Sequence, residues 1–523
     1  MAENPTLPVE SQQEHDSGYK WRVLASVVVG LFMVILDSTV VNVALKSLQQ
    51  HYSVSTNEAQ WVISLYTLAL GIATPLSGFL GDRFGVKKVY LTGLALFAFG
   101  SLLCGISTYL TSLPFLITAR AIQGIGGGIA LPLGTALLFR SFPARERGAA
   151  FGIFGIVLVF APAIGPLLGG WLVDQNQIPW IFFLNLPIGA AGLFIGGRFL
   201  SEAAGSPRVR TDIPGILLSA IGFGSILFAA SVAGEQGAGW TDQRVIIGFI
   251  VGIIALLIFA IVELRTSEPL LDLRLYAIPT FAIASVASMV GTIALFGAEF
   301  LLPLYLQILR GYTAFGAGLV LLPLAIASAF SSFLGGRLAD KIGPRLPIVA
   351  GFLLISYNTY QLSQIELNTD INFIIFLLIL RGLAVGLIIQ NSQVAALLDV
   401  PLNRLNRATP LIQATRQTMQ SIGVAVLATI LTSAITLTIP ASANQGGDLS
   451  KLPPPIREGI LHQIQLFQSQ YITGLQHAYQ ATFVIALVAT LLSLFLPGWP
   501  GKYNSGKNKT VEAPGEKPPV EVA

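Results

Sequence analysis

A carboxyl group lies inside one of the apolar runs of this chain. Asp37 stands in VILDSTVVNVALK, Val34 to Lys46, a stretch otherwise suited to lipid. Burial in apolar surroundings disfavours the ionised form of a carboxyl group, so such a group can take up and release a proton near neutral pH. A proton and a cationic small molecule can then compete for it. Asp37 is therefore a candidate coupling site; the alternative is a structural acid bonded to Asn42, Arg120 or a backbone group.

A second membrane acid, Glu299, is related to Asp37 through an internal repeat. The stretch GFLGDRFGVKK at 78–88 returns as GRLADKIGPRL at 336–346, 258 positions later, and Glu299 follows Asp37 by 262 positions. Both acids therefore fall at a similar depth in their own copy of the repeat. Asp37 and Glu299 are therefore the two candidate proton-coupling residues, one in each copy of the repeat. Pro303 leaves open the alternative that Glu299 lies close to the outer interface.

Basic and amide side chains within other apolar runs form a second group of candidates. An arginine inside a span costs about 2.5–3.5 kcal/mol on insertion scales, so Arg120 should face the bundle interior, a wet cavity or the outer interface. A buried cation such as Arg416 needs a partner or an anionic ligand. Polar side chains are also ordinary contacts between membrane helices. The candidate substrate-pathway residues are Asn42, Arg120, Gln123, Gln390, Asn391, Gln413, Arg416 and Gln417.

The repeated loop carries a frame of glycine, aspartate and glycine. Glycine permits tight turns, and the aspartate can lie at the positive N-terminal end of a neighbouring helix. Topological anchoring alone would explain the basic residues but not the repeated frame. We expect the two loops to act as a conformational latch, that is, as gating loops. Their candidate residues are Gly78, Asp82, Arg83, Gly85, Gly336, Asp340, Gly343 and Arg345.

One further stretch, GIVLVFAPAIGPLLGG, combines prolines with small residues at intervals of four. Small residues let helices approach closely, and proline allows a helix to bend. This stretch therefore predicts close packing with a hinge. Its candidate residues are Pro162, Gly165, Pro166, Gly169 and Gly170.

The composition indicates that membrane helices position these side chains. Of the 523 residues, 53% are hydrophobic and 11% are charged, whereas soluble domains have roughly 25% charged residues. Apolar runs of about 20 residues, long enough to cross a bilayer, recur along the chain. The sequence predicts an all-α polytopic membrane protein. Fourteen spans are expected, at 22–44, 59–80, 88–108, 113–138, 148–173, 179–200, 213–233, 244–264, 280–308, 315–338, 346–364, 372–397, 409–438 and 478–497.

The charges predict orientation and exclude several classes of protein. Most of the 30 Lys and Arg lie in loops that face the cytoplasm if both termini do, as the positive-inside rule requires. Because these residues are dispersed, we expect no binding of nucleic acid. The 4 His form no catalytic or metal-ligating set, and no phosphate-binding loop occurs. We therefore expect no enzyme, no metal and no cofactor. Residues 1–18 lack the features of a cleavable signal peptide.

Two six-helix units with two inserted helices between them give the expected organisation. Parallel repeats of this kind build a site at the membrane midplane between two rocking halves. In the external loop, the stripe Ile460, Ile464, Phe467 and Tyr471 predicts a short amphipathic helix lying in the outer interface. The expected ranges are a disordered N-terminal tail at 1–18, an N-terminal half at 19–205, inserted helices at 206–270, a C-terminal half at 271–500 with an external loop at 439–477, and a disordered tail at 501–523.

Seven stretches, taken in order, resemble a known family. They are LDSTVVNVALK, WVISLYTLA, GFLGDRFGVKK, LITARAIQGIGGG, APAIGPLLGGWL, WIFFLNLPIG and LPLYLQILRGYTAFGAGLVLLP. Together they resemble the major facilitator superfamily, specifically its fourteen-helix drug:proton antiporters of the EmrB/QacA type, over nearly the whole chain between Trp21 and Pro497. The stretch matching Ala161 to Gly170 is that family's antiporter signature. Ala161 replaces its first glycine, and Lys46 replaces the proline that usually ends the first-helix motif.

The resemblance implies a major facilitator fold in the cell (inner) membrane and proton-coupled export of amphipathic or cationic toxic compounds. The alternative is the same fold moving a defined metabolite such as a glycoside, saccharide or organic anion, for which Arg416 would be a supporting feature. The expected partners are a small-molecule substrate, protons and the lipid bilayer. Relatives in double-membraned bacteria often work with a periplasmic adaptor and an outer-membrane channel, which are therefore candidate partners.

Overall fold

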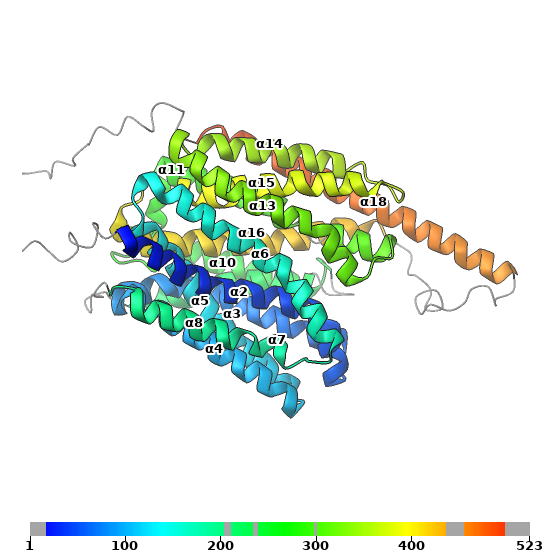
Figure 1. Cartoon of the computed structure of the whole chain (residues 1–523), viewed down its shortest axis with the longest axis horizontal. Helices are drawn as coiled ribbons and strands as arrows, with labels where there is room; N and C mark the ends of the chain where they lie inside the picture. The colour runs from blue at the N-terminus through cyan, green and yellow to red at the C-terminus, as the bar shows by residue number, and fades with distance from the viewer. Residues whose placement is uncertain (1–16, 203–210, 234–238, 298–300, 436–453, 497–523) are drawn as a thin grey trace, which may run out of the picture.

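In the computed structural model the chain forms a bundle of long helices that run side by side (Figure 1). The structure describes residues 17–202, 211–233, 239–297, 301–435 and 454–496, and no strand occurs within these ranges. Twelve helices in this part of the chain are long and apolar enough to cross a membrane. Two further helices at expected spans, α14 (Arg345–Leu362) and α16 (Leu405–Ser433), are not among those twelve. The count of fourteen therefore stays a prediction.

The N-terminal half is built around contacts of α5 with α3 and α4, and of α2 with α6 and α8. In Figure 1 most of these helices lie in the lower part of the bundle, with α6 nearer its middle. Its elements are α2 (Ser17–Tyr52), α3 (Thr56–Phe84), α4 (Val86–Leu110), α5 (Leu113–Ser141), η1 (Ala144–Glu146), α6 (Arg147–Asp174), α7 (Trp180–Phe183) and α8 (Asn185–Phe199).

Two helices follow, α9 (Ile213–Ala233) and α10 (Gln243–Arg265), and pack chiefly on each other. We call this pair the inserted hairpin. Helix α9 also contacts α3 of the N-terminal half and α16 of the C-terminal half. Helix α10 presents large apolar side chains such as Ile250, Ile254 and Leu257 on the surface. Such a surface suits lipid rather than water, as expected for a membrane helix.

The C-terminal half repeats the packing of the first, with α13 and α14 against α15. Helices α13, α14 and α15 lie together in the upper part of Figure 1. Its remaining elements are η2 (Leu273–Ala277), α11 (Pro279–Gly297), α12 (Leu301–Leu304), a π-helical turn η3 (Tyr305–Leu309), α13 (Ala314–Ile342), α15 (Ile371–Leu397), η4 (Leu402–Arg404) and α18 (Pro454–Ser493).

Local sequence explains where equivalent helices begin and end. Ser55 and Glu58 form a capping box at the start of α3, in which each backbone N–H donates to the other side chain. At its far end Gly85 has φ 94° and donates its N–H to the Gly81 carbonyl. Its repeat counterpart Gly343 has φ 92° and ends α13 in the same way. Glycine adopts such angles without strain, so the repeated glycines end α3 and α13 alike.

The expected short amphipathic helix in the outer interface is wrong. Residues from Arg457 onward belong to one continuous helix, α18, whose first turns project beyond the bundle (Figure 1). Its 40 residues correspond to about 60 Å at 1.5 Å per residue. The apolar stripe of Ile464, Phe467 and Tyr471 continues in register to Leu475, which is buried against the bundle. With no proline after Pro455 in α18, nothing ends the helix at the membrane surface.

The described chain starts and finishes at the same end of the bundle. The first turn of α2 and the last turn of α18 both lie towards the left in Figure 1. This arrangement agrees with an even number of membrane crossings. The tails expected at 1–18 and 501–523 lie outside the described residues apart from the first turn of α2, and the domain ranges stay predictions.

Candidate functional site

Asp37 is buried inside the N-terminal half, with 1% of its surface exposed. Its Oδ2 accepts a hydrogen bond from Arg120 Nη1 at 2.5 Å, an ion pair between α2 and α5. Its Oδ1 accepts from Gln123 Nε2 at 2.8 Å and from Asn185 Nδ2 at 2.7 Å. We call these four residues the Asp37 cluster. Asp37 is therefore not the lone carboxylate that the sequence suggested, because α5 and α8 both supply donors to it.

Arg120 is equally enclosed, with 1% exposure. Its Nε donates to the Val62 carbonyl of α3 at 3.2 Å, and Nη1 also donates to Gln123 Oε1 at 2.7 Å. Its guanidinium lies 4.0 Å from the centre of the Tyr66 ring, close enough for a cation–π contact. Of the three positions that the sequence left open for Arg120, the structure shows the bundle interior.

Two members of this polar network were missed in the sequence. Asn185 begins α8, and besides Asp37 it donates to Ser101 Oγ of α4 at 2.9 Å. Ser101 in turn donates to the Phe182 carbonyl at 2.8 Å. The available signal was an amide in the apolar run WIFFLNLPIG, the same kind of signal that singled out Gln390. Asn42, by contrast, is exposed on α2 and is not one of the hydrogen-bond partners of Asp37.

Close packing of α6 on α2 holds the helix that carries Asp37. A Cβ atom at Gly165 would lie 2.0 Å from Thr39 Oγ1, and one at Gly169 would lie 3.0 Å from the Val40 carbonyl oxygen. Thr39 Oγ1 also donates to the Ala161 carbonyl at 3.4 Å. The expected small-residue contact is thus formed directly beside Asp37.

The other residues of that stretch take different positions. Gly170 has no atom within 4 Å of where its Cβ would lie. Pro162 is half-buried, and the side chain of Pro166 lies outside the description. Helix α6 runs unbroken through both prolines. The expected hinge stays a prediction.

The two repeated loops each bridge the halves at the same end of the bundle. Asp82, at the end of α3, accepts from Asn406 Nδ2 at 2.6 Å and from Arg407 Nε at 3.2 Å, both on α16. Asp340, at the end of α13, accepts from the backbone N–H groups of Gly148 and Ala149 at 2.7 Å each, in the first turn of α6. We call these two sets of contacts the Asp82 interlock and the Asp340 interlock.

Glycines bring the backbones together at both interlocks. A Cβ at Gly78 would lie 2.1 Å from the Asn406 carbonyl oxygen, and one at Gly336 would lie 2.0 Å from the Gly148 carbonyl oxygen. Arg83 donates to Thr211 Oγ1 at 2.6 Å. Thr211 lies two residues before α9, so this bond connects the Asp82 loop to the start of the inserted hairpin. Arg345 lies half-buried at the start of α14. Gly78 and Asp82 of the first copy, and Gly336 and Asp340 of the second, thus lie at contacts between the two halves, and the gating role of the loops stays a prediction.

The remaining polar candidates lie elsewhere in the C-terminal half. Gln390 on α15 has 1% exposure, and neither of its amide atoms has a hydrogen-bond partner among the described residues. Asn391, also buried, donates to the Leu387 carbonyl at 2.8 Å. Arg416 on α16 is half-buried, with its guanidinium 5.4 Å from the centre of the Phe296 ring.

No carboxylate of the described ranges pairs with Arg416. Gln413 and Gln417, on the same stripe of α16, are also half-buried. Glu299 lies outside the described residues, so its expected partnership with Asp37 is not placed. Of the eight substrate-pathway candidates, the structure gathers only Arg120 and Gln123 at Asp37.

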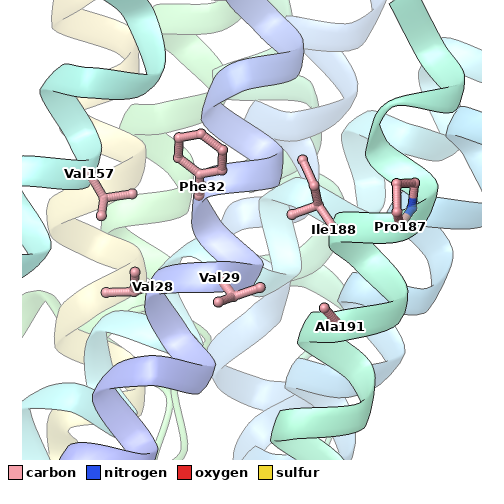
Figure 2. Close-up of a pocket in the computed structure, with 7 residues that line it drawn as sticks. All are labelled: Val28, Val29, Phe32, Val157, Pro187, Ile188 and Ala191. Atoms are coloured by element: carbon pink, nitrogen blue, oxygen red, sulfur yellow. The ribbon is translucent and has the colours of Figure 1, made fainter. Parts of the chain in front are cut away.

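An apolar groove of about 480 Å³ lies beside the Asp37 helix, between α2, α6 and α8. Figure 2 shows Val28, Val29 and Phe32 of α2 facing Val157 across one side and Ile188 across the other. Phe32 precedes Asp37 by five residues on the same helix. The full lining is Val28, Val29, Phe32, Val157, Pro187, Ile188 and Ala191. Such a surface fits the apolar part of an amphipathic molecule.

An all-helical bundle with a buried ion pair in one half and two repeated interlocks between its halves is the architecture of a secondary membrane transporter. The profile of the Major Facilitator Superfamily matches residues 27–424. The chain belongs to this family. The predicted all-α polytopic membrane protein with a major facilitator fold is confirmed.

Three known proteins are similar to this chain over most of its length. It is 30% identical to the lincomycin resistance protein LmrB of Listeria innocua over 93% of this chain and 99% of that one. It is 31% identical to the multidrug resistance protein Stp of Mycobacterium tuberculosis, over 90% of each chain. The crystal structure of the human organic anion transporter MFSD10 superposes with a TM-score of 0.62, covering 91% of this chain and 99% of that one, at 13% identity. That last likeness concerns the fold alone.

Proposed function

We propose that this protein exports amphipathic or cationic toxic compounds in exchange for protons, by alternating access. Two relatives named for resistance to lincomycin and to multiple drugs, each similar over 90% of this chain or more, support export of toxic compounds. The position in a cell (inner) membrane with both termini in the cytoplasm, and the absence of enzymatic activity, are part of the same proposal.

The observation that carries proton coupling is the buried ion pair between Asp37 and Arg120. If Asp37 takes up a proton, Arg120 becomes a buried cation that no other carboxylate among the described residues pairs with. A buried charge without its partner is strongly unfavourable. Protonation therefore favours an arrangement of α2 and α5 in which Arg120 reaches water. A cationic substrate bound at Asp37 would displace Arg120 by the same competition.

Alternating access requires the two interlocks to open. Both lie at the end of the bundle where α2 begins, which the positive-inside pattern places in the cytoplasm. Opening this end means separating Asp82 from α16 and Asp340 from α6. The substrate would enter from that side, and its apolar part could lie in the groove of Figure 2, which is lined in part by α2, the helix that carries Asp37.

A periplasmic adaptor and an outer-membrane channel remain candidate partners. The first turns of α18 project beyond the bundle at the end away from the interlocks (Figure 1). Exposed apolar residues on these turns include Leu461 and Leu466. In a double-membraned cell, this would be the part of the described chain that an adaptor meets first.

Transport into proteoliposomes under an imposed pH gradient tests the coupling. We expect wild type to accumulate a cationic dye against its gradient and Asp37→Asn to lose this gradient-driven movement. Gln50→Ala is the matched control, because Gln50 is exposed on the same helix outside the Asp37 cluster. Normal accumulation by Asp37→Asn would overturn the assignment of Asp37.

Substrate class needs a separate measurement. Cells that produce the protein should retain less ethidium than cells that do not. Equal retention of the dye, combined with movement of a saccharide, would favour the alternative of a metabolite transporter.

A further inference from the structure

Two carboxyl groups meet at the base of the inserted hairpin, away from the Asp37 cluster. Asp212 immediately precedes α9, and Glu263 lies in the last turn of α10. A Cβ atom at Gly215 would lie 2.4 Å from Asp212 Oδ2 and 2.5 Å from Glu263 Oε1. The two oxygens therefore converge on the space that Gly215 leaves free.

Glu263 is fully enclosed, with 0% exposure, and neither of its oxygens has a hydrogen-bond partner among the described residues. Its polar neighbours are the Asp212 carboxyl group and the backbone N–H groups of Leu270 and Leu271, none of which reaches full hydrogen-bond geometry. Asp212 Oδ1 accepts from the Gly215 N–H at 2.9 Å, but Asp212 Oδ2 has no such partner. The unpaired oxygens of the two acids thus face each other.

The charged groups of the surrounding elements do not neutralise this pair. Arg83 reaches Thr211 rather than Asp212, and Arg274 donates to the carbonyls of Leu264 and Thr266. Arg404, from η4, pairs with Asp272 at 3.3 Å. Within the described ranges no basic side chain forms an ion pair with Asp212 or Glu263.

Two like charges this close and away from water cannot both persist at low energy. A single shared proton removes the repulsion and supplies the missing donor between the carboxyl groups. The N–H groups of Leu270 and Leu271 then face the one remaining negative charge. The same situation arises wherever two carboxyl groups occupy one enclosed site.

We propose that Asp212 and Glu263 form a proton-binding site in which the two carboxyl groups share one proton, and that loss of this proton loosens the inserted hairpin from the cytoplasmic interlocks. The neighbouring contacts supply the connection. Thr211 is bonded to Arg83 of the Asp82 loop, and Asp272 on the connection from α10 to α11 is bonded to Arg404, which lies two residues before Asn406. Repulsion between the acids would act on both contacts.

The shared proton is tested by infrared spectroscopy of the full-length protein in lipid, titrated with strong base. We expect one carboxylic acid band that disappears as the pH rises and that is absent from both Glu263→Gln and Asp212→Asn. Asp272→Asn is the matched control, because Asp272 is a buried acid of the same region whose partners are Arg274 N–H and Arg404. A band that persists in both single variants would overturn the proposal.

A second variant keeps both acids but separates them. Gly215→Ala places a methyl group between Asp212 Oδ2 and Glu263 Oε1, so the band should move to lower pH. An unchanged band in Gly215→Ala would contradict sharing.

The loosening is tested by thermal unfolding at several pH values. As the pH rises above the ordinary pKa of a glutamate, the unfolded chain releases a proton that the folded site still holds. Wild type should therefore lose stability over this range relative to Glu263→Gln, which lacks that carboxyl group. Parallel curves for the two proteins would contradict the loosening. Neither measurement uses transport, so this proposal and proton-coupled export can fail independently.

Discussion

The ion pair of Asp37 and Arg120 has both members enclosed, and each depends on the other for its charge balance. Burying two charges is unfavourable unless geometry and further hydrogen bonds compensate. Here Gln123, Asn185 and the Val62 carbonyl supply those bonds. The Asp37 cluster, together with its contact to the Val62 carbonyl, therefore connects the four helices α2, α3, α5 and α8.

A double-mutant cycle between Asp37 and Arg120 tests this dependence. Arg120→Gln alone should lower the free energy of unfolding by about 3–5 kcal/mol, because it leaves a buried carboxylate without its cation. Combining it with Asp37→Asn should restore part of that loss, since neighbouring sites in one network are not additive. Thermal unfolding in detergent provides the measurement. Strictly additive losses would show that the two side chains act independently.

Asn185 offers a milder test of the same cluster. In Asn185→Leu, Asp37 Oδ1 keeps only Gln123 as a donor and Ser101 Oγ loses one partner, so we expect a loss of about 1–3 kcal/mol. Accumulation of substrate under a pH gradient should also weaken. Unaltered stability of Asn185→Leu would show that Asn185 does not stabilise the Asp37 cluster.

At the scale of helices, the close contact between α2 and α6 depends on glycines of α6, which have no side chain. Gly165→Val should disrupt transport and stability, because even its Cβ would fall 2.0 Å from Thr39 Oγ1. Gly170→Ala is the natural comparison, since no atom lies within 4 Å of its Cβ position. Both variants can be compared by size-exclusion profile and by transport in proteoliposomes. Equal behaviour of the two would mean that the close contact with Thr39 has no role.

The positions of helices could be predicted better than their rotations. Apolar runs mark spans because lipid requires them, and each expected span overlaps at least one described helix, although the span at 280–308 includes residues outside the description. The glycines at 85 and 343 also end α3 and α13 as their repeat suggested. The sequence alone does not select Arg120 as the partner of Asp37, because the spacing of residues along α2 does not show which side chains of α5 face Asp37.

Asn185 and the length of α18 escaped prediction for related reasons. Asn185 is important only because α8 brings it to Asp37, a contact between residues 148 positions apart. The start of α18 has an amphipathic stripe that suits an interfacial helix and a projecting helix equally. Only the packing of Tyr471 and Leu475 within the bundle distinguishes the two.

For the whole molecule, we expect the two interlocks to determine how readily the two halves separate at the end of the bundle where α2 begins. Asp340→Ala removes the acceptor of two backbone N–H groups and should shift the population towards separation of α6 from α13. Each 1.4 kcal/mol lost corresponds to about a tenfold change in that equilibrium. Spin labels at Ala144 and Lys341, both exposed, would report longer distances in the variant. An unchanged distance distribution would exclude Asp340 as a closing contact.

The interlocks are equivalent by the repeat but not by chemistry. The Asp82 interlock uses the side chains of Asn406 and Arg407, whereas the Asp340 interlock uses main-chain donors that every residue except proline possesses. Substitutions of Asn406 or Arg407 on α16 can therefore weaken the Asp82 interlock. Substitutions on α6 leave the Asp340 interlock intact as long as residue 148 stays small and residues 148 and 149 are not proline. If the proposed gating holds, substitutions on α16 can therefore adjust the strength of the Asp82 interlock and so the time for which the two halves stay in contact, whereas the Asp340 interlock stays constant.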